Sequence, residues 1–481
     1  MTRSLQRAGL HRGYRSGELT PADVVDAVYD RIVARGDDAV WIHLVDRTQA
    51  HARARELAAR YAGRALPPLY GLPFGVKDNV DVAGLPTTAA CPDFAYMARD
   101  TAPVVARALA AGAILVGKTN LDQFATGLTG TRSPYGVVRN PFDARVIAGG
   151  SSSGSAVAVA VGLVSFAIGT DTAGSGRVPA GLTGTVGVKP SRGLVSSRGV
   201  VPACRSLDCP SIFALSAADG AAVLAVVAGL DPADPFSRPL PAPPPVPTEL
   251  DAATLRVGVP ASAGLGLPAE TAEVFAGVVR RLEAWGAQLV PVDLGPFLEV
   301  GDLLYEGPWI AERMATLEGF VAANPAAVHP VTRQVLAGAQ GVRGVDVFRG
   351  MHALAEGRVR TAGTWTAVDV VVVPTAPGAP SVEAVLADPI RENATLGRFT
   401  NFVNLLDLAA VAAPAAMTPG GIPAGVTFLA PAGADALLGG LADAWQREAA
   451  LPVGATGHAL EPAAHASRRT GPDAPSLAHR P

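Results

Sequence analysis

The sequence predicts an α/β fold built on a central β-sheet. Short apolar runs typical of buried strands alternate with alanine-rich segments typical of helices. The chain has 481 residues, of which 49% are hydrophobic, so it can bury a large core. Residues 103–112 and 113–117 illustrate the alternation, because a helical segment leads directly into an apolar strand. The length is compatible with several domains or with one large α/β unit.

The first predicted element is a helix that begins near Pro21. Thr20 is a typical N-cap, Pro21 suits the first helical position, and Asp23 places an acidic residue in the first turn. A second helix is predicted from about residue 48 to 61. Both helices precede any predicted strand, so residues 1–65 are expected to form N-terminal helices that pack on the core.

The remaining predicted elements continue the alternation of strand and helix. Strands are predicted at residues 69–82, 113–117, 164–169, 255–259, 288–292, 368–373 and 427–429. Helices are predicted at residues 103–112, 155–162, 269–285, 297–323 and 434–449. These elements place the main domain at residues 66–450.

Two segments are predicted to lack regular structure. Residues 231–248 contain eight prolines and are predicted to be an extended surface linker within the main domain. Residues 451–481 are rich in alanine, proline, glycine and histidine, and are expected to form a disordered tail.

The composition argues against several classes of partner. The net charge is −3, from 39 basic and 42 acidic residues, which favours neither nucleic acid nor an anionic membrane. No signal peptide or convincing membrane span is predicted, and a cytoplasmic location is expected. The three cysteines (Cys91, Cys204 and Cys209) form no disulfide framework. No metal or cofactor is predicted, because the sequence has no HExxH motif and no paired zinc ligands.

Lysine is almost absent from this chain. Of the 39 basic residues, only Lys77, Lys118 and Lys189 are lysines, and all three lie in or beside glycine-rich segments. Arginine stays protonated at neutral pH, whereas a buried lysine can lose its proton. A site that needs a neutral amine as its base would therefore keep lysine. Chance and ordinary ion pairing are the alternative, above all for Lys118 and Lys189.

A glycine- and serine-rich stretch at residues 148–177 is the strongest candidate site. A first cluster at 149–155 and a second at 171–177 flank an apolar run at 156–168. Glycine lets the backbone turn sharply and lets other groups approach closely, as a serine nucleophile beside an oxyanion hole requires. A phosphate-binding loop is a weaker alternative, because the Gly-Lys-Ser/Thr ending is missing.

The base that would activate such a serine is predicted to be lysine. None of the eight histidines lies in a glycine-rich motif, although a distant Ser-His-Asp triad stays possible. A lysine can act as a base only when it is neutral, and burial lowers its pKa from about 10.4. A serine can pass a proton on, because its hydroxyl both donates and accepts.

The combination of Lys77 with residues 149–154 and 171–177 resembles the amidase signature family, over roughly residues 71–449. By this resemblance Ser175 is the nucleophile, Ser151 is a bridging serine that follows a cis peptide bond, and Lys77 is the base. The fold implied is the amidase signature fold, a large twisted mixed β-sheet sandwiched by α-helices. The candidate oxyanion hole consists of four backbone N–H groups, those of Thr172, Ala173, Gly174 and Ser175.

Within that family, several stretches resemble allophanate hydrolases. They lie at residues 120–136, 204–209, 304–313 and 400–407. Allophanate is N-carboxylated urea, a small anion that suits a guanidinium and neutral donors. Arg313 and Tyr305 are predicted to share one helix, eight residues apart on nearly the same face. By the resemblance they hold the carboxylate, with Gly127 and Ser152 as further substrate-binding residues.

The resemblance carries further expectations about partners. The partner would be a small-molecule amide substrate, with a functional link to a biotin-dependent urea carboxylase. A C-terminal domain common in allophanate hydrolases has no counterpart in the low-complexity residues after 451. A homodimer through the first two helices is expected.

Three alternatives stay open. One is a hydrolase of another small amide, either a biuret-type compound or a range of simple amides. A second is the amidase subunit of a glutamyl-tRNA amidotransferase. The third is a catalytically inactive scaffold subunit, which the presence of Lys77, Ser151 and Ser175 argues against.

Overall fold

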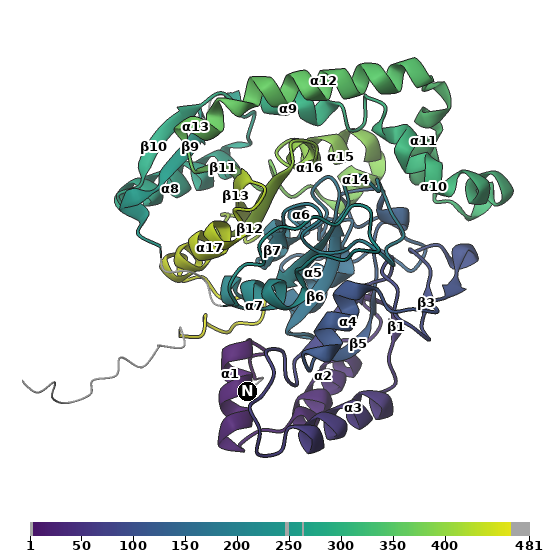
Figure 1. Ribbon diagram of the computed structural model, residues 1–481, viewed down its shortest axis with the longest axis vertical. Helices are drawn as coiled ribbons and strands as arrows, with labels where there is room; N and C mark the ends of the chain where they lie inside the picture. Colours follow the sequence, from purple (N-terminus) through teal and green to yellow (C-terminus); the bar gives the residue numbers. More distant parts are fainter. Residues whose placement is uncertain (1–2, 246–249, 262–263, 463–481) are drawn as a thin grey trace, which may run out of the picture.

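An 11-stranded β-sheet forms the centre of the computed structural model, which describes residues 3–245, 250–261 and 264–462 (Figure 1). The strands lie in the order β1-β5-β2-β6-β8-β7-β12-β13-β11-β9-β10. Their bounds are β1 (Trp41–Leu44), β2 (Pro73–Lys77), β5 (Ile114–Thr119), β6 (Phe166–Asp171), β7 (Val186–Lys189), β8 (Cys209–Ala214), β9 (Arg256–Pro260), β10 (Gln288–Val292), β11 (Val370–Pro374), β12 (Leu408–Met417) and β13 (Pro423–Pro431). A separate small sheet pairs β3 (Pro86–Thr87) with β4 (Tyr96–Met97).

The large sheet is mixed. β2 runs parallel to both β5 and β6, and β9 runs parallel to both β10 and β11. The other pairs in the sheet, including β6 with β8 and β12 with β13, are antiparallel. The prediction of an α/β protein with a large mixed sheet is therefore confirmed.

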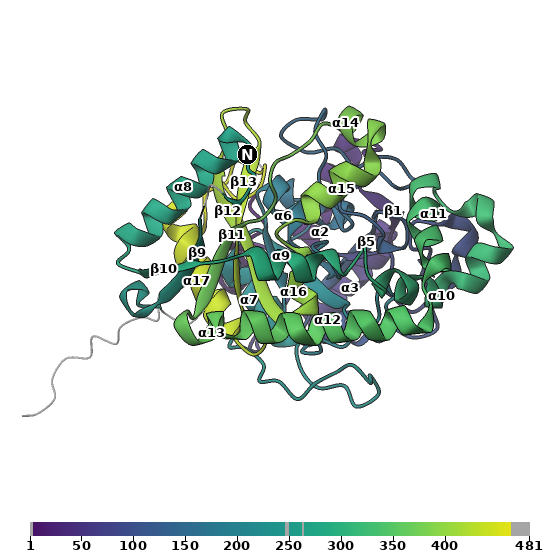
Figure 2. The ribbon, with the colours of Figure 1, turned by 90° about the horizontal axis from the view of Figure 1, so that it is seen from above.

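Helices cover both faces of this sheet. Their bounds are α1 (Arg7–Ser16), α2 (Pro21–Arg35), α3 (Arg47–Arg60), α4 (Pro103–Ala110), α5 (Ser153–Ala160), α6 (Val178–Thr183), α7 (Ala217–Val227), α8 (Ala269–Ala284), α9 (Gly295–Asp302), α10 (Trp309–Ala323), α11 (Pro330–Ala337), α12 (Gly344–Ala362), α13 (Thr364–Ala367), α14 (Val382–Ala387), α15 (Pro389–Gly397), α16 (Asn401–Leu405) and α17 (Asp435–Ala449). Neighbouring residues of β7 show the two faces, since Gly187 points to α6 and Val188 points to α7. Figure 2 shows the long helix α12 running across one side of the molecule. Among the helices that the structure describes, none is both long and apolar enough to cross a membrane.

The N-terminal segment contributes a strand as well as helices. α2 begins at Pro21 as predicted, and Thr20 and Asp23 form a reciprocal capping box at its start. The expectation that no strand precedes the second helix was wrong, because β1 lies between α2 and α3 and pairs antiparallel with β5. Four residues are too few for an alternating pattern to distinguish a strand.

The long helix predicted at residues 297–323 is in fact two helices, α9 and α10, and this prediction was wrong. Residues 303–308 form a turn between them. Pro308 has no N–H to continue a helical ladder, and it directly precedes the first residue of α10. Tyr305 therefore lies in the turn, while Arg313 lies on α10.

The two segments predicted to be irregular differ in their packing. Residues 231–245 contain no helix or strand, and residues 246–249 of the predicted linker lie outside the described residues. Residues 451–462 of the predicted tail pack on the protein, which differs from the expected disorder. Val453 is fully buried, and Gln6 Nε2 donates to Ala459 O at 2.9 Å. Residues 463–481 lie outside the described residues.

Trp445 gives a test of how α17 packs against the sheet. Its ring is fully buried against Phe428 and Trp285, and its Nε1 donates to Pro414 O at 2.8 Å. We expect Trp445→Ala to lower the free energy of unfolding by about 3–5 kcal/mol in a urea titration, because a large cavity remains. Trp445→Phe keeps an aromatic ring and should lose clearly less. Equal losses in the two variants would contradict this account.

Candidate active site

The candidate site lies at the carboxyl ends of two parallel strands, β2 and β6. Lys77 is the last residue of β2, and Asp171 is the last residue of its parallel neighbour β6. Parallel strands end on the same side, so Lys77 lies close to the turn that follows Asp171 and leads into α6. Every residue of both strands is buried. Clefts at the carboxyl ends of strands are the usual binding positions in open α/β sheets.

The first glycine- and serine-rich cluster enters the same region just before α5. The Gly150–Ser151 peptide bond is cis, as the family resemblance implies. Gly150 cannot carry a side chain, because the Asp122 carboxylate occupies the space that a Cβ would need. Asp122 Oδ2 also accepts the N–H groups of Thr129 and Gly130, at 3.1 and 3.0 Å. The loop after β5 therefore fixes the backbone that presents Ser151.

The three predicted catalytic side chains form one hydrogen-bonded chain. Lys77 Nζ donates to Ser151 Oγ at 2.7 Å, and Ser151 Oγ donates to Ser175 Oγ at 2.9 Å. Lys77 Nζ also donates to Thr170 Oγ1 at 2.7 Å. The exposed fractions of Lys77, Ser151 and Ser175 are 0%, 0% and 3%. With Lys77 neutral and both hydroxyls donating in the opposite direction, the same contacts can carry a proton from Ser175 to Lys77.

Burial lowers the pKa of Lys77 to about 7, because the charged amine has lost its hydration. The carboxylates of Asp122, Asp208 and Asp171 oppose this effect from a distance. A substantial fraction of Lys77 is then neutral at neutral pH, which is the state that a base requires.

The turn at residues 172–175 has free backbone donors. Within the described residues, the N–H groups of Thr172, Ala173, Gly174 and Ser175 reach no backbone or side-chain acceptor. Buried N–H groups are rarely left unpaired. Four such groups in one turn can hold the negative oxygen of a tetrahedral intermediate. Gly174 has φ +144, and the space beside it is filled by Thr400.

A buried ion pair braces this turn. Arg177 Nε and Nη2 donate to the two oxygens of Asp171, both at 2.9 Å, and both side chains are fully buried. Asp171 Oδ2 also accepts the N–H of Gly176 at 3.0 Å. Burial by itself would raise the pKa of Asp171, but the charge and forked hydrogen bonds of Arg177 outweigh it and keep the pKa below its usual value. The turn is thus fixed at both ends.

Tyr305 and Arg313 meet, although they do not share a helix. The guanidinium carbon of Arg313 lies 5.7 Å from the centre of the Tyr305 ring. Arg313 is 2% exposed, and its Nη1 donates to Thr126 Oγ1 at 3.1 Å. In the described part of the chain, no carboxylate forms an ion pair with Arg313. A buried guanidinium without a carboxylate partner can bind an anion.

The two other predicted substrate-binding residues lie in different settings. The carbonyl oxygen of Gly127 is 3.5 Å from Ser175 Oγ, so this residue borders the predicted nucleophile. The Ser152 hydroxyl instead donates to Thr170 O at 3.1 Å, within the protein. The structure therefore directs the Ser152 side chain to β6 rather than towards Ser175.

The other two lysines, Lys118 and Lys189, bind groups other than the two catalytic serine candidates. Lys118 Nζ forms an ion pair with Asp78 at 3.0 Å, with both side chains fully buried. Lys189 Nζ donates to Pro190 O at 2.9 Å. These contacts give both lysines structural roles.

Sequence reasoning missed two polar residues that touch this site. Thr170 binds Lys77 directly, and its place just before Asp171 in a glycine-rich motif could have indicated it. Asp208 accepts a hydrogen bond from Thr172 Oγ1, and burial raises the pKa of Asp208 to about 6. Its position in the sequence Ser-Leu-Asp gave no sign of this long-range contact.

Comparison with known proteins places the chain in a family. Residues 23–438 match the Amidase family. The chain is 42% identical over 396 residues to urea amidolyase of Lachancea kluyveri, covering 82% of this chain and 21% of that protein. It is 36% identical over 466 residues to a glutamyl-tRNA(Gln) amidotransferase subunit of Deinococcus deserti, covering 90% of this chain and 94% of that protein. Allophanate hydrolase of Kluyveromyces lactis superposes with a TM-score of 0.86 at 37% identity, covering 93% of this chain and 74% of that one.

The chain therefore belongs to the amidase family, as an amidohydrolase acting on amide substrates. Within this family it is similar to urea amidolyase and to allophanate hydrolase. It spans about a fifth of the length of the urea amidolyases that it matches.

The lowered pKa of Lys77 predicts the pH dependence of hydrolysis. Only the neutral amine accepts a proton, so kcat/KM should rise as the pH increases through about 7. Well below that value it should fall about tenfold for each pH unit. Lys77→Arg is the matched control and should be inactive throughout, because arginine does not lose its proton. A rate that stays constant down to about pH 5 would exclude Lys77 as the base.

Proposed function

We propose that this protein hydrolyses allophanate to ammonia and carbon dioxide, as the last step of urea degradation. The observation that carries the substrate assignment is Arg313, a buried guanidinium in contact with Tyr305 and without a carboxylate partner among the described residues. The carboxylate of allophanate would supply that partner, while Tyr305 and neutral donors bind the rest of the anion. The similarity to urea amidolyase and allophanate hydrolase supports the same assignment.

In the proposed mechanism Ser175 is the nucleophile. Its oxygen attacks the terminal amide carbon while Ser151 takes the hydroxyl proton and passes its own proton to Lys77. The backbone N–H groups of residues 172–175 hold the resulting oxyanion. The carbon–nitrogen bond then breaks, and ammonia leaves with the proton that Lys77 returns through Ser151.

Water completes the reaction by the same route. It attacks the acyl-enzyme, gives a proton to the Ser151–Lys77 pair, and releases Ser175 with its proton restored. The product is an N-carboxylated carbamate, which loses carbon dioxide to give carbamate, and carbamate takes up a proton and breaks down to the second ammonia and a second carbon dioxide. No step requires a cofactor.

A second proposal is a different small amide as substrate, either a biuret-type compound or a range of simple amides. The observation behind it is that the candidate triad, with Gly127 beside Ser175, would attack other small amides by the same chemistry. The amidase subunit of a glutamyl-tRNA amidotransferase is the third alternative, supported by similarity along nearly the whole chain. The carboxylate of the substrate distinguishes the first proposal from the second, because biuret and simple amides are neutral.

The proposal extends to the surroundings of the protein. We place it in the cytoplasm as a homodimer, with a functional link to a biotin-dependent urea carboxylase that supplies allophanate. Size-exclusion chromatography with light scattering tests the dimer, and a monomer at micromolar concentration would contradict it.

The first experiment compares ammonia release from allophanate, biuret, malonamate and simple amides, with Ser175→Ala as the blank. We expect a strong preference for allophanate. Turnover of neutral amides with none of allophanate would overturn the substrate assignment and leave the triad in place.

Arg313→Met tests the recognition of the carboxylate. Loss of the guanidinium should lower kcat/KM for allophanate by about 100-fold, chiefly through KM, because a charged hydrogen bond contributes about 1.5–3 kcal/mol. Turnover of a neutral amide should change much less. Arg349→Met, a matched change on the exposed side of α12, should leave both unchanged. Equal losses on charged and neutral amides would contradict carboxylate binding by Arg313.

A further inference from the structure

The loop at residues 204–209 contacts both halves of the proposed site, yet no part of the mechanism uses it. It lies between β7 and β8, and its last residue begins β8. On one side Asp208 accepts a hydrogen bond from Thr172 Oγ1, in the turn that carries the free N–H groups. Asp208 Oδ2 also accepts the N–H of Ala203 at 2.9 Å, which fixes the carboxylate within the loop.

On its other side the loop is joined to the first turn of α10. The two carboxylate oxygens of Glu312 accept the N–H and the hydroxyl of Ser206, both at 2.7 Å. Cys204 Sγ lies 3.6 Å from Trp309 O, at the start of the same helix. Glu312 is the immediate neighbour of Arg313, so this forked contact fixes the backbone that carries the guanidinium.

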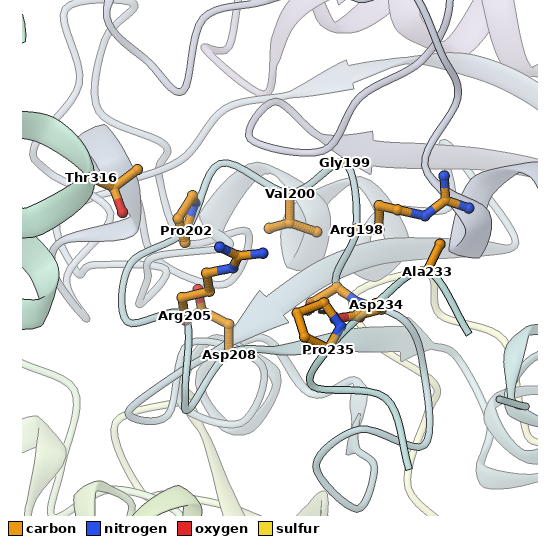
Figure 3. A pocket seen from close by; sticks show the side chains of 11 residues that line it. Arg198, Gly199, Val200, Pro202, Arg205, Asp208, Ala233, Asp234, Pro235 and Thr316 are labelled. Carbon is orange, nitrogen blue, oxygen red and sulfur yellow. Dashed lines mark hydrogen bonds between the residues drawn. The ribbon is translucent and has the colours of Figure 1, made fainter. Parts of the chain in front are cut away.

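A cavity leaves the rest of this contact open. It measures about 310 Å³ and is lined by Arg205 and Asp208 of the loop, by Thr316 of α10, and by residues of the segments 197–202 and 233–235 (Figure 3). Figure 3 shows Thr316 at the left, Arg205 and Asp208 below the centre, and Arg198 with Ala233 and Asp234 at the right. The Ser206–Glu312 pair supplies the two shortest contacts between loop and helix that the described residues show, beside the longer contact of Cys204 Sγ.

We propose that Ser206 and Glu312 are positioning residues that couple carboxylate binding at Arg313 to the alignment of the oxyanion-hole turn. When Arg313 holds an anion, the first turn of α10 becomes fixed. The Ser206–Glu312 pair transmits that constraint to the loop, and Asp208 transmits it to Thr172. Binding energy from the substrate carboxylate, which does not react, then helps to align the N–H groups that stabilise the transition state at the amide carbon. This inference rests on the proposed allophanate hydrolase function.

The test removes the pair and compares two readouts. Glu312→Ala deletes both hydrogen bonds, and Glu318→Ala is the matched control, an exposed carboxylate on the same helix. The first readout is kcat and KM for allophanate. The second is the rate at which a neutral fluorophosphonate probe labels Ser175, a reaction in which the substrate carboxylate takes no part.

We expect Glu312→Ala to lower kcat for allophanate about tenfold or more, with a smaller change in KM and a labelling rate within about twofold of wild type. Glu318→Ala should match wild type in both. Parallel loss of kcat and labelling would show a purely structural role and overturn the inference, as would unchanged kcat. If Glu312→Ala fails to fold, Ser206→Ala removes one of the two bonds and should show a smaller loss of kcat in the same direction.

The wild-type protein separates this inference from the proposed function. Labelling of Ser175 without hydrolysis of allophanate would overturn the function itself. Hydrolysis of allophanate by the wild type, with both readouts unaffected in Glu312→Ala, would overturn the coupling alone.

Discussion

The hydrogen bond from Lys77 to Ser151 is the interaction on which the rest of the site depends. An ammonium group buried without a partner is costly, so the fold must either pair it with a carboxylate or let it lose its proton. Here Lys77 lies at the end of a strand buried between two parallel neighbours and contacts two hydroxyls, those of Ser151 and Thr170. Neither hydroxyl stabilises a charge as a carboxylate would, and this favours the neutral amine.

The carboxylate next to Lys77 in the sequence does not form an ion pair that would keep the lysine charged. Asp78 follows Lys77 directly, and its carboxylate pairs with Lys118 rather than with Lys77. In the same way Arg177 engages the carboxylate of Asp171. Two acids near Lys77 thus pair with other cations, and the charges of Asp122, Asp208 and Asp171 raise the Lys77 pKa too little to cancel the effect of burial. Lys118 and Arg177 therefore each hold an acid that could otherwise form an ion pair near Lys77.

The sequence was sufficient to predict which three side chains meet in the candidate triad, but not how Tyr305 and Arg313 come together. Lys77, Ser151 and Ser175 each lie in a glycine-rich motif, and strands that end together bring the motifs into contact. The proximity of Tyr305 and Arg313 was predicted for a wrong reason, because the helix that was to align them is interrupted at Pro308. Long-range contacts such as Asp208 with Thr172 leave no periodic pattern, so only the folded structure shows them.

Arg313 differs from the other buried charges near the site, and this difference bears on specificity. Asp171, Asp78 and their partners form ion pairs within the free protein, whereas the hydrogen bonds of Arg313 within the described residues go to a carbonyl and a hydroxyl oxygen. Burial lowers the pKa of Arg313, but Cys204, Tyr305 and the more distant carboxylates of Asp208 and Glu312 outweigh this effect. An anion that reached Arg313 would add a direct ion pair that a neutral amide cannot form, so a site of this kind would discriminate between charged and neutral amides. The loop at residues 204–209 lies where that discrimination can reach the reacting carbon.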